Sequence, residues 1–184
     1  MSVTVTDLTQ GPATIYTGLF GAAEPLETAV NDTPQASAWG DVGGTTDGLK
    51  LVIKTTFKDL EVDQLIDVPG TRPTLREITM ETNMAEPSLD NLKYALNGGT
   101  ISTGVGWRAF EPVDSDAATQ PNYSALLVHG WFGTGRRMVV VRKVLSVEGT
   151  ETQYKKDGQT VFKVTIKGFY VSPSIRPFRI IDAD

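Results

Sequence analysis

Two long runs of alternating apolar and polar residues flank the dipeptide Pro69-Gly70. In the first, residues 49–58, apolar side chains mostly alternate with lysines, and in the second, residues 74–84, Ile78, Met80 and Met84 fall on one face. A period of two residues is typical of a β-strand with one buried face. Because a Pro-Gly turn signal separates the runs, the sequence predicts one long antiparallel hairpin.

The rest of the chain favours the same secondary structure. Strand-like runs occur at residues 13–20, 123–132, 136–149 and 159–171, and 18 Gly and 10 Pro residues supply turns between them. One segment, residues 85–99, is helical instead. We therefore expect a mainly β fold, a β-sandwich or barrel with one packed α-helix and a long hairpin.

The predicted helix has signals at both ends. Pro87 suits a first helical turn, Ser88 or Glu86 can cap it, and Gly98-Gly99 stops it. A short helix with one apolar stripe must pack on another element, most simply a sheet. The residues expected to make that contact are Leu89, Leu92 and Leu96.

A chain of 184 residues suits one domain. We expect an N-terminal arm at residues 1–12 and a single domain at 13–184. Within it, residues 21–48 and 100–122 form extended loops, the second with a candidate strand at 105–111.

Composition excludes several classes of function. The chain has no cysteine, so disulfides and thiolate metal sites are absent. The first residues do not resemble a signal peptide, and no apolar run is long enough to span a membrane, so we expect synthesis in a cytosol and no membrane insertion. A net charge of −5 disfavours tight non-specific binding of DNA.

No catalytic, cofactor or metal motif is found, so we expect no enzyme. The single histidine, His129, falls within a strand and is expected to be structural, because a catalytic site needs partners. Residues 114–119 begin like a calcium loop but lack its Gly and terminal Glu. Asn122 begins a glycosylation sequon, but no secretion signal is found, so we expect the sequon to be coincidental. Arg136-Arg137 either begins a strand or meets an acidic partner.

The predicted hairpin has an unusual composition. Apolar Leu65, Ile66 and Val68 sit at its turn, where no partner within the chain is evident. Carboxylates concentrate along it, although like charges that lie close together repel one another. They are Asp59, Glu61, Asp63, Glu77 and Glu81, with Lys54, Lys58 and Arg76 as nearby counter-charges. An exposed apolar tip favours an interface with another chain.

This stretch resembles a known family. The string EVDQLIDVPGTRPTLREITMETNMAEPSLDNLKYALNGG, with the upstream WGDVGGTTDGLKL, is similar to the major tail tube proteins of long-tailed bacteriophages, especially those infecting actinobacteria. The resemblance covers residues 39–99, and the later strands agree with it in order and type.

The resemblance implies a structural virion protein with the phage tail tube fold. Such proteins form stacked hexameric rings, a homo-oligomer whose continuous β-barrel surrounds a lumen through which genomic DNA passes without adhering. Their partners are the tape measure, tail terminator and distal tail proteins. The candidate lumen-lining residues are Glu77, Thr79, Glu81, Asp59, Glu61 and Asp63. The candidate inter-ring or inter-subunit contacts are Leu65, Ile66, Val68, Pro69 and Arg72.

Two other classes stay open at this point. One is a related β-rich component, such as a contractile-system inner tube or a tail terminator. The other is a cellular binding module or hydrolase, which would need a concave polar site.

Overall fold

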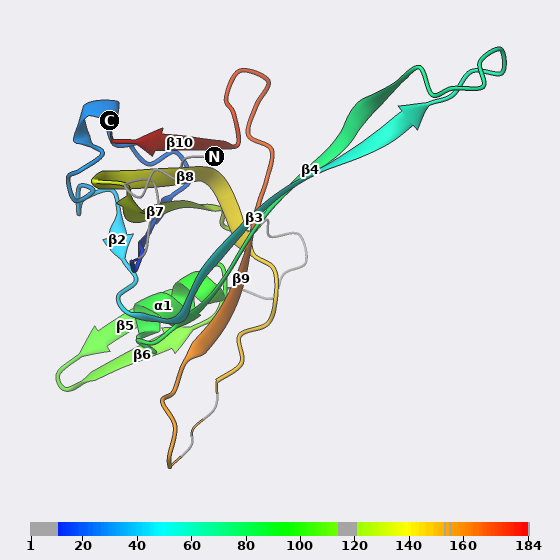
Figure 1. Ribbon diagram of the computed structural model, residues 1–184. Coiled ribbons are helices and arrows are strands. Elements are labelled where there is room, and N and C mark those ends of the chain that lie inside the picture. Colours follow the sequence, from blue (N-terminus) through cyan, green and yellow to red (C-terminus); the bar gives the residue numbers. More distant parts are fainter. Residues whose placement is uncertain (1–10, 114–120, 153, 155, 184) are drawn as a thin grey trace.

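The computed structural model describes residues 11–113, 121–152, 154 and 156–183, and over these residues the protein is mainly β with one α-helix (Figure 1). The predicted fold class is therefore confirmed. The predicted arm falls almost wholly outside the described residues, as does the calcium-like loop at 114–119. The strands are β1 (Thr14–Leu19), β2 (Gly40–Asp41), β3 (Thr45–Leu60), β4 (Gly70–Met84), β5 (Thr100–Gly104), β6 (Trp107–Glu111), β7 (Ser124–Phe132), β8 (Gly135–Ser146), β9 (Phe162–Gly168) and β10 (Phe178–Asp182).

One large antiparallel sheet has the strand order β2-β1-β7-β8-β9-β4-β3, and β10 pairs with β8 outside this path. The sheet has two halves, β2-β1-β7-β8 and β9-β4-β3, and strand β8 links them. Its residues Arg137–Val141 pair with β10, whereas Val144–Ser146 pair with β9 along the same edge. The strand bends between these two partners, so that β7 and β8 cross the β9-β4-β3 half (Figure 1).

The main core lies between the two halves of this sheet. Alternation on β4 directs Ile78, Met80 and Met84 into it, as predicted, and all three are buried. They meet side chains from β1, β7, β8 and β9 that share the same cluster. These are Ile15, Leu126, Val128, Val139, Val141, Val144, Phe162, Val164 and Ile166.

Residues 21–44 cover the other face of β1, β7 and β8. The sequence predicts a structureless connection over residues 21–48, but the structure shows a 3-10 helix, η2 (Glu27–Ala29), the short strand β2 and, from Thr45, the start of β3. Trp39 is buried in this cover, and its indole N–H donates to the carbonyl of Ala23 at 2.8 Å. The segment therefore completes a second core layer, with Tyr16, Leu127 and Val140 beneath Trp39.

The predicted helix is present as α1 (Leu89–Ala95), capped by Ser88, whose Oγ accepts from the Asn91 N–H at 3.1 Å. Its inward face differs from the predicted leucine stripe. Asn91 and Ala95 are buried, Leu89 and Leu92 are half-buried, and Leu96 is 42% exposed. Burial of Leu96 is thus a wrong prediction.

Hydrogen bonding of Asn91 explains the rotation of the helix. Its Nδ2 donates to the carbonyls of Val42 and Glu86, both at 2.8 Å. These bonds hold the face of Asn91 and Ala95 toward the core. Leu92 packs against the main core from the side of this face, as predicted, whereas Leu96 points outward. Leu96 also lies beyond the last helical residue, at the C-cap.

The segment at 100–122 is a second correction. Strands β5 and β6 pair as a separate two-stranded sheet, where the sequence predicts only a loop with one strand. Arg108 on β6 pairs with Asp90 of α1 at 3.0 Å and so ties this small hairpin to the helix.

Replacing Ala95 by Leu tests the position of the helix. Because Ala95 is buried, the larger side chain should lower the free energy of unfolding by about 1–3 kcal/mol. The exposed neighbour Leu96, changed to Ala, should alter it by no more than about 0.5 kcal/mol. Urea denaturation of both variants measures the two free energies of unfolding. A larger loss for Leu96→Ala than for Ala95→Leu would show that the leucine face, and not the face of Ala95, is buried.

Candidate assembly surfaces

The β3–β4 hairpin has an anchored base and a free arm. Its strands pair from Thr45 opposite Met84 to Leu60 opposite Gly70, but β9 pairs with β4 only over Ile78–Met84. Beyond Ile78 the described residues supply no third strand, and the arm projects away from the body (Figure 1). An isolated two-stranded hairpin is marginally stable in water. The predicted hairpin is confirmed, and no described residue covers its outer half.

The end of this arm carries exposed apolar side chains. Leu65 is 57% exposed, Val68 is 54% exposed, and Ile66 is as exposed as in an extended chain, at 105%. Pro69 and Arg72 are exposed as well. The exposure expected for these candidate contacts is confirmed, whereas their contact with another copy stays a prediction. We call residues 59–69 the arm tip.

The arm tip is also the acidic part of the molecule. It holds Asp59, Glu61, Asp63 and Asp67 and contains no Lys or Arg. These four carboxylates account for nearly all of the net charge of −5, which leaves the remainder of the chain at −1. No ion pair to a described residue engages any of them.

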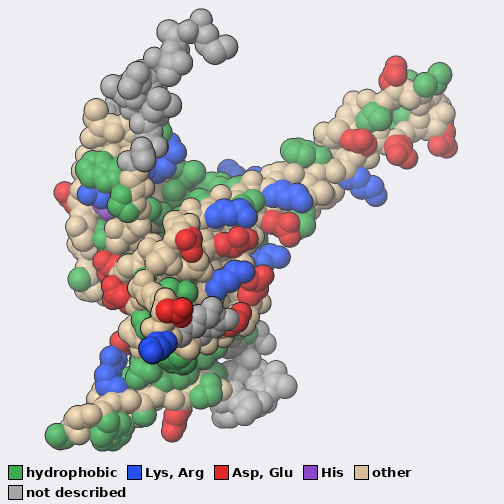
Figure 2. All heavy atoms as spheres, turned by 60° about the horizontal axis from the view of Figure 1, so that its bottom comes forward, with side chains coloured by type: hydrophobic (Ala, Val, Ile, Leu, Met, Phe, Trp, Pro, Cys, Tyr) green, Lys and Arg blue, Asp and Glu red, His purple; other side chains and the backbone are tan. Residues whose placement is uncertain are grey.

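The outer face of the β9-β4-β3 half carries charges of both signs. Glu77, Thr79 and Glu81 are half-buried and point away from the core, as predicted. Glu81 pairs with Lys50 of β3 at 3.3 Å, and Glu77 pairs with Lys167 of β9 at 3.6 Å. Red and blue side chains accordingly alternate over the sheet (Figure 2).

The prediction of one acidic face therefore needs correction. The six candidate lumen-lining residues fall into two sets. Glu77, Thr79 and Glu81 lie on the mixed-charge face, whereas Asp59, Glu61 and Asp63 lie at the arm tip. Lys54 stands opposite Glu77, and β9 adds Lys163 and Lys167 on the same side. The sequence does not reveal this balance, because it does not show that β9 is the neighbour of β4.

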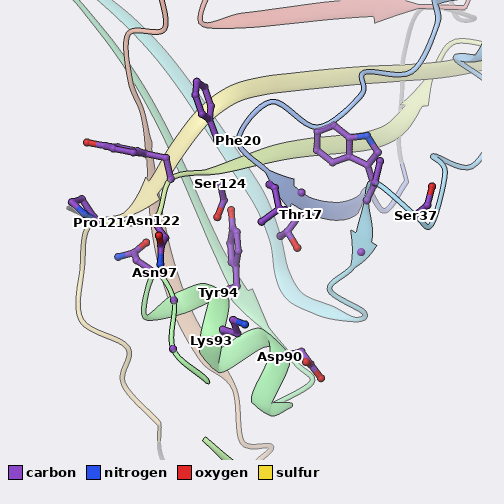
Figure 3. Close-up of a pocket in the computed structure, with 18 of the residues that line it drawn as sticks. Thr17, Phe20, Ser37, Asp90, Lys93, Tyr94, Asn97, Pro121, Asn122 and Ser124 are labelled. Atoms are coloured by element: carbon purple, nitrogen blue, oxygen red, sulfur yellow. The ribbon is translucent and has the colours of Figure 1, made fainter. Parts of the chain in front are cut away.

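A hollow of about 670 Å³ lies between β1, the end of α1 and residues 121–124. Figure 3 shows Tyr94 rising from α1 toward Ser124 and Thr17. The Tyr94 hydroxyl is buried without a hydrogen-bond partner among the described residues, and burial raises the pKa of Tyr94. Asp90, on the rim, is engaged by Arg108. The described lining holds no histidine and no second carboxylate, so it offers no acid–base pair.

The remaining candidate groups have structural partners. His129 is buried, and its Nε2 lies 2.9 Å from the carbonyl oxygen of Val30. Arg137 pairs with Asp182 through two hydrogen bonds of 2.5 and 2.8 Å, and Arg136 stacks over the ring of Trp131 at 4.3 Å. These contacts favour the structural interpretation of all three side chains.

Two further observations concern the described residues as a whole. They contain no group of three or more His, Asp or Glu side chains that could hold a metal ion. Among their helices, none has the length and apolar character needed to cross a membrane.

Comparison with known proteins adds no identification. A scan against protein-family models and a search of curated proteins both find no match for this chain.

Acidification tests the structural role of His129. Burial lowers the pKa of this side chain, so the unfolded chain, with an ordinary histidine pKa of about 6.5, binds a proton more readily than the folded protein. Above about pH 7, titration of His129 should not change the free energy of unfolding. As the pH drops below about 6.5, the free energy of unfolding should fall, because only the unfolded chain takes up the proton. His129→Gln, which keeps a donor for the Val30 carbonyl, should remove this loss. Melting temperatures between pH 7.5 and 5.5 measure it, and identical slopes for both proteins would contradict it.

Proposed function

We propose that this protein is a structural subunit that polymerises, as stacked hexameric rings, into the hollow tail tube of a long-tailed bacteriophage. On this proposal it is made in the host cytoplasm, resides in the virion and has no catalytic activity. The observation that carries the proposal is the β3–β4 arm, which is long, uncovered beyond Ile78 and apolar at its tip. The resemblance of residues 39–99 to tail tube proteins supports the same conclusion.

The edges of the large sheet supply a second argument. Its order ends at β2 on one side and at β3 on the other, so within the described residues it is not closed into a barrel. Strand β3 spans 16 residues and pairs along one edge only. A long edge strand left open is a template for uncontrolled association. Pairing between copies in a closed ring would remove both edges at once.

The mixed-charge face suits a channel that DNA crosses without binding. Tight binding of DNA depends on lysine and arginine side chains that replace the counterions of the phosphates. On this face Glu77 and Glu81 engage Lys167 and Lys50, which leaves Lys54 and Lys163 without an ion pair to a described residue. These two pairs reduce the positive charge that the face offers to the phosphates, and this reduction, rather than strong repulsion, is then what limits binding of the nucleic acid.

Shortening the arm tests the proposal directly. Electron microscopy of the purified full chain should show hollow tubes. A variant with residues 61–69 replaced by an Asn-Gly turn should fold, because the cores lie elsewhere, but should stay as rings or monomers. Circular dichroism serves as the control for folding. Tubes of normal length from the shortened chain would show that the tip is not needed, and absence of tubes from the unchanged protein would refute the function.

Charge reversal tests the lumen. Glu77→Lys combined with Glu81→Lys should remove the ion pairs of Lys167 and Lys50 and leave both lysines unmatched beside Lys54 and Lys163. Tubes of this variant should bind DNA at low salt and release it at high salt. Asp32→Lys combined with Asp157→Lys changes the net charge equally and serves as the matched control. Equal DNA binding by both variants would show that total charge matters and that Glu77 and Glu81 do not line the channel.

A further inference from the structure

The base of the arm carries a hollow whose chemistry is the reverse of that of the arm tip. It measures about 300 Å³ and lies where β9 leaves β4, between β4 and residues 168–177. Its described lining contains two arginines and no Asp or Glu. The residues that matter here are Arg76, Arg176, Phe169, Tyr170, Pro173 and Ile175. We call this hollow the basic groove.

The two arginines of the basic groove are available for a partner. Both residues are exposed, and neither guanidinium forms an ion pair with another described residue. Arg76 belongs to the part of β4 that β9 does not pair with. It lies two residues before Ile78 and therefore on the same face of the strand. Arg176 follows a turn in which the Ile175 N–H donates to Ser172 Oγ at 3.1 Å. A carboxylate reaching this groove would meet two unmatched cations.

Apolar side chains surround these charges. Tyr170 is 66% exposed and Ile175 is 47% exposed, so the groove presents an open rim of apolar surface beside its arginines. The same combination with opposite charge is found at the arm tip, where Ile66 and Leu65 are exposed among Asp63 and Asp67. Charge complementarity and matching apolar surface thus identify the tip as the occupant.

The occupant must come from another copy. From Thr55 opposite Arg76 to Leu60 opposite Gly70, the paired strands separate the groove from the tip of the same chain. At about 3.4 Å per residue this ladder spans roughly 17 Å, and its backbone hydrogen bonds prevent it from folding back on itself. Tip and groove are different surfaces, so their contact is head-to-tail and can repeat along a stack.

We propose that the acidic arm tip of one copy docks in the basic groove of the next copy, with Asp63 and Asp67 facing Arg76 and Arg176 and with Ile66 against Tyr170 and Ile175. This inference rests on the proposed function, because it specifies which surfaces join successive rings. It adds the receiving site and the charge pairs that orient the contact.

Engineered cysteines report the contact without background, since the natural chain has none. One protein carries Ile66→Cys at the tip and a second carries Pro173→Cys at the groove. Mixed and oxidised under assembly conditions, they should form a disulfide-linked pair containing one of each. Ile66→Cys mixed with Val105→Cys, at the fully exposed turn between β5 and β6, is the control and should give no link. Linkage of the Ile66→Cys protein to itself alone, or no link to the groove, would overturn the docking.

Charge exchange tests the electrostatic part. Asp63→Arg with Asp67→Arg, or Arg76→Asp with Arg176→Asp, should each raise the critical concentration for tube formation by at least about tenfold, the effect of losing about 1.4 kcal/mol per contact. A chain with all four substitutions should return toward the original value. Lys93→Asp with Lys156→Asp, two exposed positions outside both the groove and the mixed-charge face, is the matched control and should leave the critical concentration unchanged.

The two proposals fail in different ways. If the unchanged protein forms tubes but the exchanged charges leave the critical concentration unaltered, the docking is wrong and the tail tube function stands. If the unchanged protein forms no tubes, the function is refuted, and the cysteine pair then decides whether tip and groove still meet in smaller assemblies.

Discussion

Pairing of β4 on both of its edges, over only half of its length, is the constraint on which the rest of the molecule depends. Between Ile78 and Met84 the strand lies between β3 and β9, and its inward side chains complete the main core. Toward Gly70 it has β3 alone. The transition falls at Ile78 opposite Gly168, where a side chain on Gly168 would approach the Ile78 Cβ to 3.0 Å and the Val141 side chain to 3.2 Å. A glycine lets the strands and β8 come together there, and β9 then turns away. Core, arm and basic groove all originate at this one junction.

Much of this arrangement follows from local sequence. The alternation of Ile78, Met80 and Met84 with Glu77, Thr79 and Glu81 specifies which face of β4 is buried, because neighbouring side chains on a strand point in opposite directions. The Ser88 cap is equally local, since it needs only a hydroxyl three residues before a free N–H. Features of this kind are set within a few residues and can be predicted from the sequence.

The missed features depend on contacts between distant segments. Leu96 is exposed because Asn91 bonds to the carbonyl of Val42, 49 residues earlier in the chain. The balance of charge on the outer sheet face depends on Lys167, which reaches Glu77 only because β9 is the neighbour of β4. The basic groove similarly brings Arg76 beside Arg176, a hundred positions later. A helical or strand periodicity carries no information on such partners. Of the candidate assembly surfaces, only the β3–β4 arm could therefore be predicted from the sequence.

The separation of charge along the hairpin has a thermodynamic consequence. At the base, glutamates and lysines form surface pairs, each contributing about 0–1 kcal/mol, and the core beneath them supplies the stability. The arm tip has four acids, exposed apolar side chains and no core, so its own interactions favour order only weakly. Covering it with a second copy would bury apolar surface and match the acids with cations in one step. On this proposal, order of the arm and association of copies would be a single equilibrium, in which the fraction of ordered arm would rise with protein concentration. The body, whose cores are complete within one chain, has no such dependence.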